Sequence, residues 1–174
     1  CLLSRGLGDV YKRQVLYFEH KKAYRFLKEE VPETYYTVPL GKADVKRSGE
    51  DITVFCYGLM VNYCLQAADI LASDGIDVEV VDLRTVYPLD KATIIERSQR
   101  TGKVLLVTED NLEGSIMSEV SAIIAENCLF DLDAPIMRLA APDVPSMPFS
   151  PTLENEIMMN PEKIQDKMRE LAQF

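Results

Sequence analysis

Residues 80–120 read VVDLRTVYPLDKATIIERSQRTGKVLLVTEDNLEGSIMSEV, and the hydrophobic periodicity of this stretch decides the fold class. An aliphatic strand is followed by a helix, a second aliphatic strand and a second helix. Asp90 stands where an N-cap accepts backbone N–H groups, and Gly102 stands where a left-handed residue ends a helix. Strands that alternate in this way with helices indicate a parallel sheet.

The same alternation continues on both sides of this stretch. We expect strands at residues 52–57, 77–82, 104–107 and 136–139. We expect helices that begin after Gly58, Asp90 and Gly114-Ser115, and a last helix with Asn160 as N-cap and Pro161 as its first residue. Residues 42–47 predict an edge strand that turns at Ser48-Gly49 into the next strand. Four prolines predict an irregular loop over residues 142–151. The predicted fold is α/β: a three-layer αβα sandwich with a mainly parallel sheet and one antiparallel edge strand.

The first 38 residues fit no element of this sandwich. Residues 1–14, CLLSRGLGDVYKRQ, lack the apolar region of a secretory signal and resemble translated adapter sequence, so we expect a non-native leader. Residues 15–18 predict the last strand of another domain. Residues 15–38 then form a remnant of that domain with an extended linker between Pro32 and Pro39. We expect the complete domain over residues 39–174.

Composition and charge narrow the classes of partner. The chain is 47% hydrophobic and 27% charged, as soluble globular proteins are, and no apolar run approaches the roughly 20 residues of a membrane helix. Residues 109–174 hold 13 acidic and 4 basic side chains, whereas residues 1–108 hold 15 of each, so the net charge of −9 lies in the last third. This distribution disfavours nucleic acid and membrane and favours a basic protein partner, although an acidic surface also serves solubility.

The cysteine spacing argues against a metal or redox site. Cys1, Cys56, Cys64 and Cys128 match neither zinc-ligand nor CxxC patterns. We therefore expect reduced thiols in a cytoplasmic protein.

Three positions follow predicted strands, at the edge where open α/β sheets bind ligands. They are Gly58, the pair Asp82 and Arg84, and the pair Glu109 and Asp110. Gly58 lacks the further glycines of a nucleotide-binding loop. Asp82 and Arg84 suit a structural ion pair. No nucleophile or third metal ligand adjoins the pair Glu109 and Asp110 in the sequence. The single histidine, His20, lies outside the predicted domain. We expect no catalytic, cofactor-binding or metal-binding residue in this chain.

Several motifs, in order, resemble the C-terminal half of the β subunit of 2-oxoacid dehydrogenases (the E1 component), most closely the bacterial branched-chain type. They are VLYFEHKKAYR (15–25), VPLGKADVKRSGEDITVFCYG (38–58), VVDLRTVYPLD (80–90), TGKVLLVTED (101–110), EGSIMSEV (113–120) and DAPIMRLAAPDVPSMPFSP (133–151). The resemblance implies a transketolase C-terminal-like domain over residues 39–174, preceded by a remnant of the pyrimidine-binding domain.

The resemblance also implies a function that this chain holds only in part. Such enzymes use thiamine diphosphate and magnesium to decarboxylate a 2-oxoacid such as 3-methyl-2-oxobutanoate, and pass the acyl group to the lipoyl acyltransferase (E2). The expected partners are an α subunit, a second β subunit in an α2β2 heterotetramer, and the subunit-binding domain of E2. By position we expect Asp143, Glu170 and Phe174 to contribute to E2 docking. The alternatives are a pyruvate or acetoin dehydrogenase β subunit, or a non-catalytic α/β interaction module. We expect the chain alone to bind no cofactor and to be inactive.

Overall fold

A computed structural model describes residues 16–28 and 30–174. The chain divides into a unit that ends at Glu30 and a larger unit from Val31 to Phe174. The first unit contains the short helix α2 (Ala23–Phe26). The elements of the second unit are β1 (Asp44–Arg47), β2 (Ile52–Cys56), α3 (Leu59–Ser73), β3 (Val78–Asp82), α4 (Lys91–Thr101), β4 (Val104–Asn111), α5 (Ile116–Cys128), the 3-10 turn η1 (Leu129–Asp131), β5 (Met137–Ala141), α6 (Pro151–Ile157) and α7 (Pro161–Ala172).

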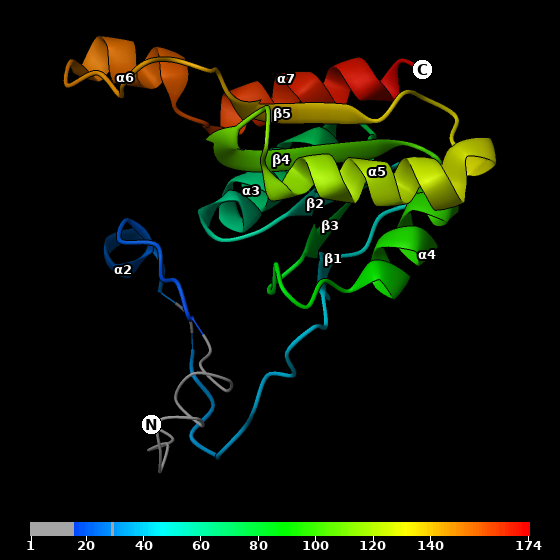
Figure 1. Ribbon diagram of the computed structural model, residues 1–174, viewed down its shortest axis with the longest axis horizontal. Helices are drawn as coiled ribbons and strands as arrows, with labels where there is room; N and C mark the ends of the chain where they lie inside the picture. Colours follow the sequence, from blue (N-terminus) through cyan, green and yellow to red (C-terminus); the bar gives the residue numbers. More distant parts are fainter. Residues whose placement is uncertain (1–15, 29) are drawn as a thin grey trace. The chain divides into compact units, whose positions relative to one another are not determined.

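The five strands of the larger unit form one sheet in the order β1-β3-β2-β4-β5. The β2, β3, β4 and β5 strands run parallel, and β1 pairs with β3 in the antiparallel sense at one edge. Helices cover both faces of this sheet (Figure 1). The predicted three-layer sandwich with one antiparallel edge strand is confirmed.

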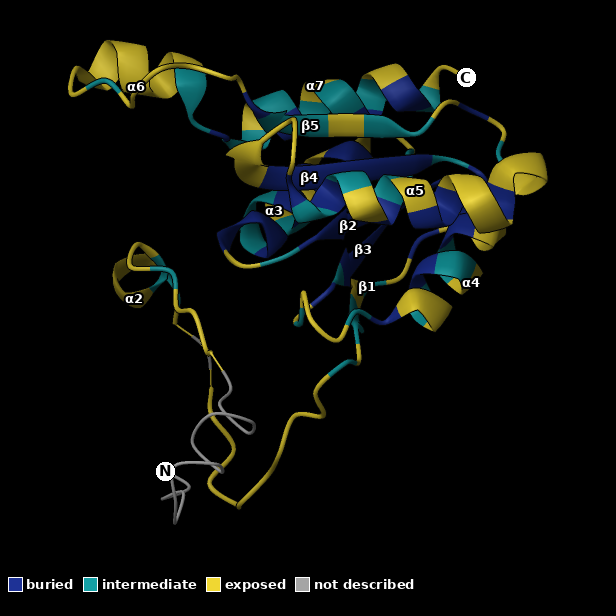
Figure 2. Ribbon diagram, viewed as in Figure 1, coloured by how far each residue is buried: buried dark blue, intermediate teal, exposed yellow. Residues whose placement is uncertain are grey.

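Alternating side chains of the central strands build two separate cores. Ile52, Val54 and Cys56 point from β2 toward α3 and α7, whereas Phe55 points toward α4 and α5 on the other face. Because β2 and β4 are buried on both faces, their hydrophobic residues form nearly continuous runs (Figure 2).

The expected helix boundaries are confirmed at two helices. The Asp90 side chain accepts the N–H of Thr93 at 3.3 Å, and Gly102 ends α4 with a φ of 66°. Asn160 caps α7 by accepting the N–H of Lys163 at 2.9 Å, with Pro161 as the first helical residue. Helix α4 therefore begins and ends where its sequence signals predict, and α7 begins where its signal predicts.

The expected hairpin at Ser48-Gly49 is wrong. The edge strand β1 pairs with β3, with Asp44 opposite Asp82, and makes no ladder with β2. The connection from β1 to β2 must therefore pass the amino end of β3. Gly49 lies at this crossing, where an added Cβ would be 2.3 Å from the carbonyl carbon of Val78. Gly49 therefore allows two backbones to approach closely and is not the turn of a hairpin.

The expected strand at residues 15–18 is not observed in its described part. Residues 16–18 have no regular structure, and their side chains are exposed. A strand needs a neighbouring strand to satisfy its backbone hydrogen bonds, and no described strand pairs with this segment. Residue 15 and the predicted leader at 1–14 lie outside the described residues, and the predicted domain division stays a prediction.

The loop predicted over residues 142–151 is followed by a helix that the sequence reading missed. Helix α6 begins at Pro151, the last of the four prolines, which occupies its first position. None of the residues of α6 is buried. The hydrophobic periodicity of a buried face is therefore missing from this segment, and periodicity was the signal on which the other helices were predicted.

Candidate functional site

Gly58 lies at the carboxyl edge of the sheet, where it follows β2 and is the N-cap of α3. Its φ of 61° and ψ of −137° belong to a region that side chains rarely allow. An added Cβ would meet nothing within 4 Å, so the glycine serves backbone geometry. No second glycine follows in α3 to form a phosphate loop.

Asp82 and Arg84 lie at the same edge and are connected through the backbone. The N–H of Arg84, whose φ is 55°, donates to the Asp82 carboxylate at 2.9 Å. The Arg84 guanidinium instead donates to Asp44 of β1 at 2.6 Å, and Lys46 adds an ion pair to Asp44 at 2.9 Å. Burial raises the pKa of Asp82, whereas the hydrogen bond from Lys46 lowers the pKa of Asp44. The arrangement fastens the loop after β3 to the edge strand.

Glu109 and Asp110 end β4, and both are exposed. The Asp110 carboxylate accepts the N–H of Asn111 at 2.9 Å, while its own N–H donates to the Thr108 hydroxyl at 3.2 Å. The Tyr57 hydroxyl also bonds to Thr108, at 2.9 Å. These contacts order the end of the strand.

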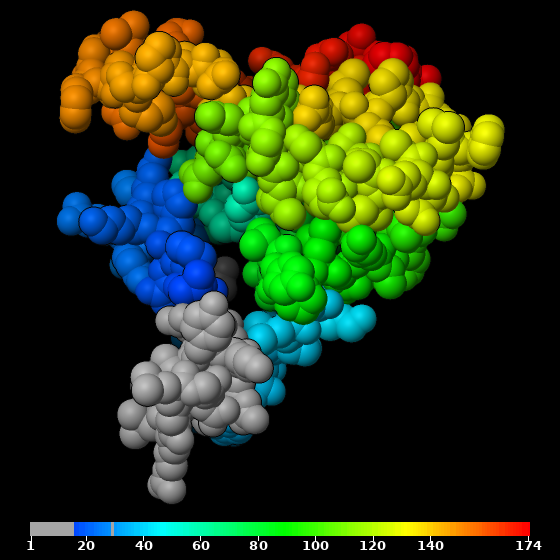
Figure 3. Space-filling view, in the orientation of Figure 1, coloured from blue at the N-terminus to red at the C-terminus, as the bar shows by residue number. Residues whose placement is uncertain are grey.

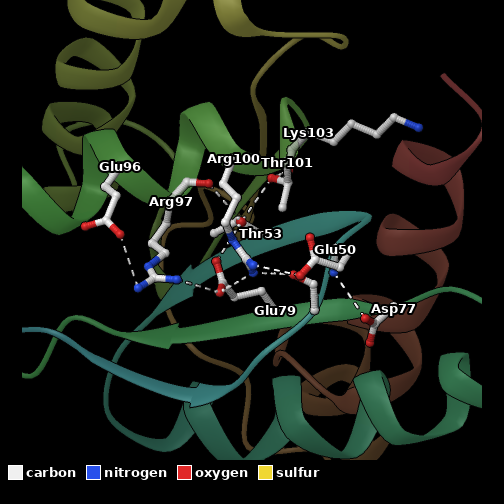
Figure 4. Close-up of polar contacts among 10 residues, drawn as sticks. Glu50, Thr53, Asp77, Glu79, Glu96, Arg97, Arg100, Thr101 and Lys103 are labelled. Carbon is white, nitrogen blue, oxygen red and sulfur yellow. Dashed lines mark hydrogen bonds and ion pairs between the residues drawn. The ribbon is translucent and has the colours of Figure 1, made fainter.

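A buried carboxylate at the amino end of the sheet escaped the sequence reading. Glu79 is 0% exposed and lies beneath α4, on the same sheet face as Phe55 (Figure 4). Its carboxylate accepts the Thr53 hydroxyl at 3.1 Å and the Arg100 guanidinium at 2.7 Å, with Arg97 at 3.5 Å. Arg100 also donates to Glu50 at 2.8 Å. The signal available in the sequence was a charged residue, Glu79, within the otherwise apolar run of β3. A carboxylate buried there needs hydrogen-bond donors in place of water.

The described cysteines are Cys56, Cys64 and Cys128, and all are buried free thiols. A hydrogen bond with Cys64, together with burial, raises the pKa of Cys56 well above its usual value, and burial raises that of Cys128. Both shifts favour the unreactive protonated thiol. Among residues 16–28 and 30–174, no group of three or more His, Cys, Asp or Glu side chains is placed to hold a metal ion.

The expected docking residues lie at two ends of the sheet. Asp143 is exposed in the loop that follows the carboxyl end of β5. Phe174 and Glu170 lie at the end of α7, where the Lys103 ammonium contacts the carbonyl of Ala172 beside the start of β4. Figures 1 and 3 show α6 and the end of α7 at opposite sides of the domain. The Glu170 carboxylate pairs with Lys167 at 2.7 Å.

Comparison with known families gives the fold a name. Residues 41–164 match the family model of the transketolase C-terminal domain. This chain belongs to the transketolase C-terminal domain family. A solved split-gene transketolase, described as an inactive β4 tetramer, shares the fold of this domain, with a TM-score of 0.70 and 23% identity over 82% of this chain and 47% of that chain.

Curated relatives of this transketolase C-terminal domain protein are β subunits of dehydrogenases. It is 66% identical to the 2-oxoisovalerate dehydrogenase subunit beta of Bacillus subtilis, across 99% of this chain and 52% of the relative. It is 45% identical to the B. subtilis acetoin:2,6-dichlorophenolindophenol oxidoreductase subunit beta (86% and 43% covered), and 44% identical to the pyruvate dehydrogenase E1 component subunit beta (92% and 49%). The resemblance stated from the motifs is confirmed.

The chain thus spans about half the length of the curated relatives it matches. The alignment with the 2-oxoisovalerate dehydrogenase subunit beta covers 173 residues and so reaches into residues 1–14 of this chain. The interpretation of residues 1–14 as a leader stays a prediction. In the part of the chain that the structure describes, no helix combines the length and hydrophobicity needed to cross a membrane.

Proposed function

We propose that this chain supplies the C-terminal part of the β subunit of a branched-chain 2-oxoacid dehydrogenase, which oxidises 3-methyl-2-oxobutanoate. The observation that carries the proposal is the 66% identity to the 2-oxoisovalerate enzyme, against 45% and 44% for the acetoin and pyruvate relatives. In this proposal the chain contributes packing between β subunits and docking of the acyltransferase, and residues elsewhere in the complex carry the chemistry.

The described residues do not fit a site for thiamine diphosphate and magnesium. Among the described residues, no group of three or more His, Cys, Asp or Glu side chains is placed to hold a metal ion. The turn at Gly58 also lacks a phosphate-binding loop. When bound in such an enzyme, the cofactor supplies the carbanion chemistry of 2-oxoacid decarboxylation. We place it outside this chain, together with the residues that activate it.

The acidic last third of the chain supports docking of a basic partner, which we propose is the subunit-binding domain of E2. Asp143 and Phe174 lie at opposite ends of the domain, so one small partner does not reach both on a single protomer. Contacts with both would require two partner domains or a second β subunit beside the first. Charges at the rim of an interface mainly accelerate encounter, and salt weakens them.

A pair of chimeric β subunits tests the proposed substrate class. Residues 39–174 replace the corresponding half of the B. subtilis 2-oxoisovalerate β subunit in one chimera, and that of the pyruvate dehydrogenase β subunit in the other. Each is assembled with the remaining subunits of its own enzyme. We expect the first chimera to assemble and to oxidise 3-methyl-2-oxobutanoate, and the second to assemble poorly. Equal or better support of pyruvate oxidation would contradict the proposal.

Docking is tested on the first chimera with the isolated subunit-binding domain of E2. Asp143→Asn, Glu170→Gln and removal of Phe174 are compared with the intact complex at low and high salt. The matched control is Glu126→Gln, an exposed acid of α5 that lies outside the expected docking residues. We expect at least one of the three changes to weaken binding. The control should leave the affinity unchanged. Unchanged affinity for all three would place docking elsewhere.

A further inference from the structure

A cavity of about 230 Å³ opens at the amino end of the sheet, away from the carboxyl edge where open α/β sheets bind ligands. Its lining residues are Asp51, Gly75, Ile76, Lys103 and Ala172. We propose that this cavity binds a small zwitterion, an α-amino acid with a short aliphatic side chain. The inference goes beyond the proposed function and does not depend on it, because it concerns this chain alone.

Three connections of the fold bring the lining residues together. Asp51 precedes β2 and Lys103 precedes β4, so both lie at the amino ends of neighbouring parallel strands. Gly75 and Ile76 lie in the turn between α3 and β3, and Ala172 is the last residue of α7. Figure 4 shows the Lys103 side chain reaching toward α7. A Cβ added at Gly75 would meet nothing within 4 Å, so the turn leaves the cavity open.

Asp51 and Lys103 give the cavity one charge of each sign. The Asp51 carboxylate is held in place, because it accepts the N–H of Asp77 at 2.7 Å while the Asp51 N–H donates to the Asp77 carbonyl at 2.9 Å. Lys103 is half-buried, and its ammonium contacts the carbonyl oxygen of Ala172 at 3.5 Å. Each group has further capacity, since a carboxylate offers two acceptor oxygens and an ammonium three donors. Among the described residues the two charges form no ion pair with each other, although they border one cavity.

These charges select a ligand that carries both signs. A simple anion would pair with Lys103 but would face the Asp51 carboxylate, and a simple cation would meet the opposite conflict. A zwitterion satisfies both groups, because its carboxylate accepts from Lys103 and its ammonium donates to Asp51. The carboxyl-terminal ends of α3 and α7 also border the cavity, and the carbonyl groups at a helix end favour a nearby positive charge.

The size and the apolar lining of the cavity set the rest of the ligand. Pockets for drug-sized ligands have volumes of roughly 300 to 1,000 Å³, so a cavity of about 230 Å³ suits a smaller molecule. Ile76 and Ala172 supply an apolar wall, since both pack against the core between the sheet and helices α3 and α7. An α-amino acid such as valine matches the charges, the volume and this wall.

The test titrates the intact, isotope-labelled chain with L-valine and follows the backbone amide signals by NMR. We expect saturable shifts at the residues that line the cavity. Isobutyrate lacks the ammonium and isobutylamine lacks the carboxylate, so each should bind at least about tenfold more weakly, the loss expected for one hydrogen bond between charged groups. Equal affinity for all three compounds would mean that the cavity does not recognise charge and would overturn the proposal.

Two substitutions assign the two charges. Lys103→Met should lower the affinity for L-valine to that of isobutylamine, and Asp51→Asn should lower it to that of isobutyrate, because each variant removes the contact that the analogue also lacks. Asparagine keeps an oxygen that accepts the N–H of Asp77, so the turn before β2 should stay intact. The amide spectrum of each variant without ligand shows whether it is folded. The comparison of the three compounds on the unmodified chain needs no variant.

Matched controls change the same residue types outside the cavity. Lys167→Met and Asp166→Asn alter surface side chains of α7 and should leave L-valine binding unchanged. The proposal is wrong if L-valine causes no saturable shift, if the shifts lie at other residues, or if the Lys103 and Asp51 variants bind L-valine as the unmodified chain does. The chimeric enzymes are measured without L-valine, so the proposed function is decided separately.

Discussion

Glu79 places a carboxylate inside an aliphatic strand, where only its hydrogen-bond donors offset the loss of water. We expect Glu79→Ala to lower the free energy of unfolding by about 3 kcal/mol, the low end for breaking a buried ion pair, because Arg97 and Arg100 keep some access to solvent. Urea denaturation at neutral pH measures this. Glu96→Ala is the control, since Glu96 pairs with Arg97 from an exposed position, and should change stability by less than about 0.5 kcal/mol.

Asp90 joins the start of α4 to the segment before β1. Burial alone would raise its pKa, but bonds from the N–H of Ala43 and from Thr93 outweigh burial and lower it. A lowered folded-state pKa adds stability that is present above the unfolded value and is lost as pH falls through the folded-state pKa. We expect Asp90→Ala to cost about 2 kcal/mol at neutral pH. The difference in the free energy of unfolding between this variant and the unmodified protein should shrink as the pH falls below the ordinary pKa of an aspartate, about 3.9. A difference independent of pH would contradict the charge-assisted cap.

Among the connecting segments, the β1–β2 crossing depends on the absence of a side chain at Gly49. We expect Gly49→Ala to destabilise the domain by about 2 kcal/mol or more, because the added methyl would meet the backbone of Val78 and Glu79, which cannot rotate away. Thermal denaturation measures the loss. Gly75→Ala is the comparison: its Cβ meets nothing, and only its φ of 81° is unfavourable, so we expect a loss of about 1 kcal/mol.

Helix α6 depends on Lys163, whose ammonium donates to the carbonyl of Glu156 at 2.7 Å, more than on any buried residue. We expect Lys163→Met to increase hydrogen exchange of the amides of residues 151–157 while the free energy of global unfolding changes by less than about 1 kcal/mol, because the helix contributes no buried side chain to the core. Lys167→Met removes a lysine that pairs with Glu170 on the surface of α7 and should leave α6 unchanged. Equal exchange in both variants would show that the ammonium does not hold the helix.

The helices with a buried face, α3, α4, α5 and α7, could be predicted from the sequence, whereas α6, which has none, could not. The limits of α4 follow from Asp90 and Gly102 because both residues act locally, through a side-chain cap and a left-handed backbone. The pairing of β1 with β3 depends instead on contacts between residues distant in sequence, such as Asp44 opposite Asp82. The Glu79 cluster could not be predicted for the same reason, because its hydrogen-bond donors come from β2 and α4. The docking residues were predicted from the family resemblance, which gives positions in the sequence but no distances or orientations.

At the scale of the whole chain, the proposed function places the cofactor site outside the described residues. We expect the purified chain to bind thiamine diphosphate with magnesium only weakly, because no acidic cluster of its described residues is placed for the metal ion. Isothermal titration calorimetry tests this directly. A dissociation constant in the low micromolar range, about −8 kcal/mol, would show that the cofactor is held here.

The edge strand β1 also limits how this protein can aggregate. An unpaired sheet edge offers N–H and C=O groups to strands of other molecules, and long, flat, apolar edges can extend into fibrils. The β1 strand has 4 residues, a register shift between Val45 and Arg47, and charged side chains at Asp44, Lys46 and Arg47. An incoming strand would find a short, irregular template and would have to remove these charges from water. Asp44, which fastens the loop after β3 through Arg84, therefore also helps Lys46 and Arg47 to protect the open side of the sheet from polymerisation.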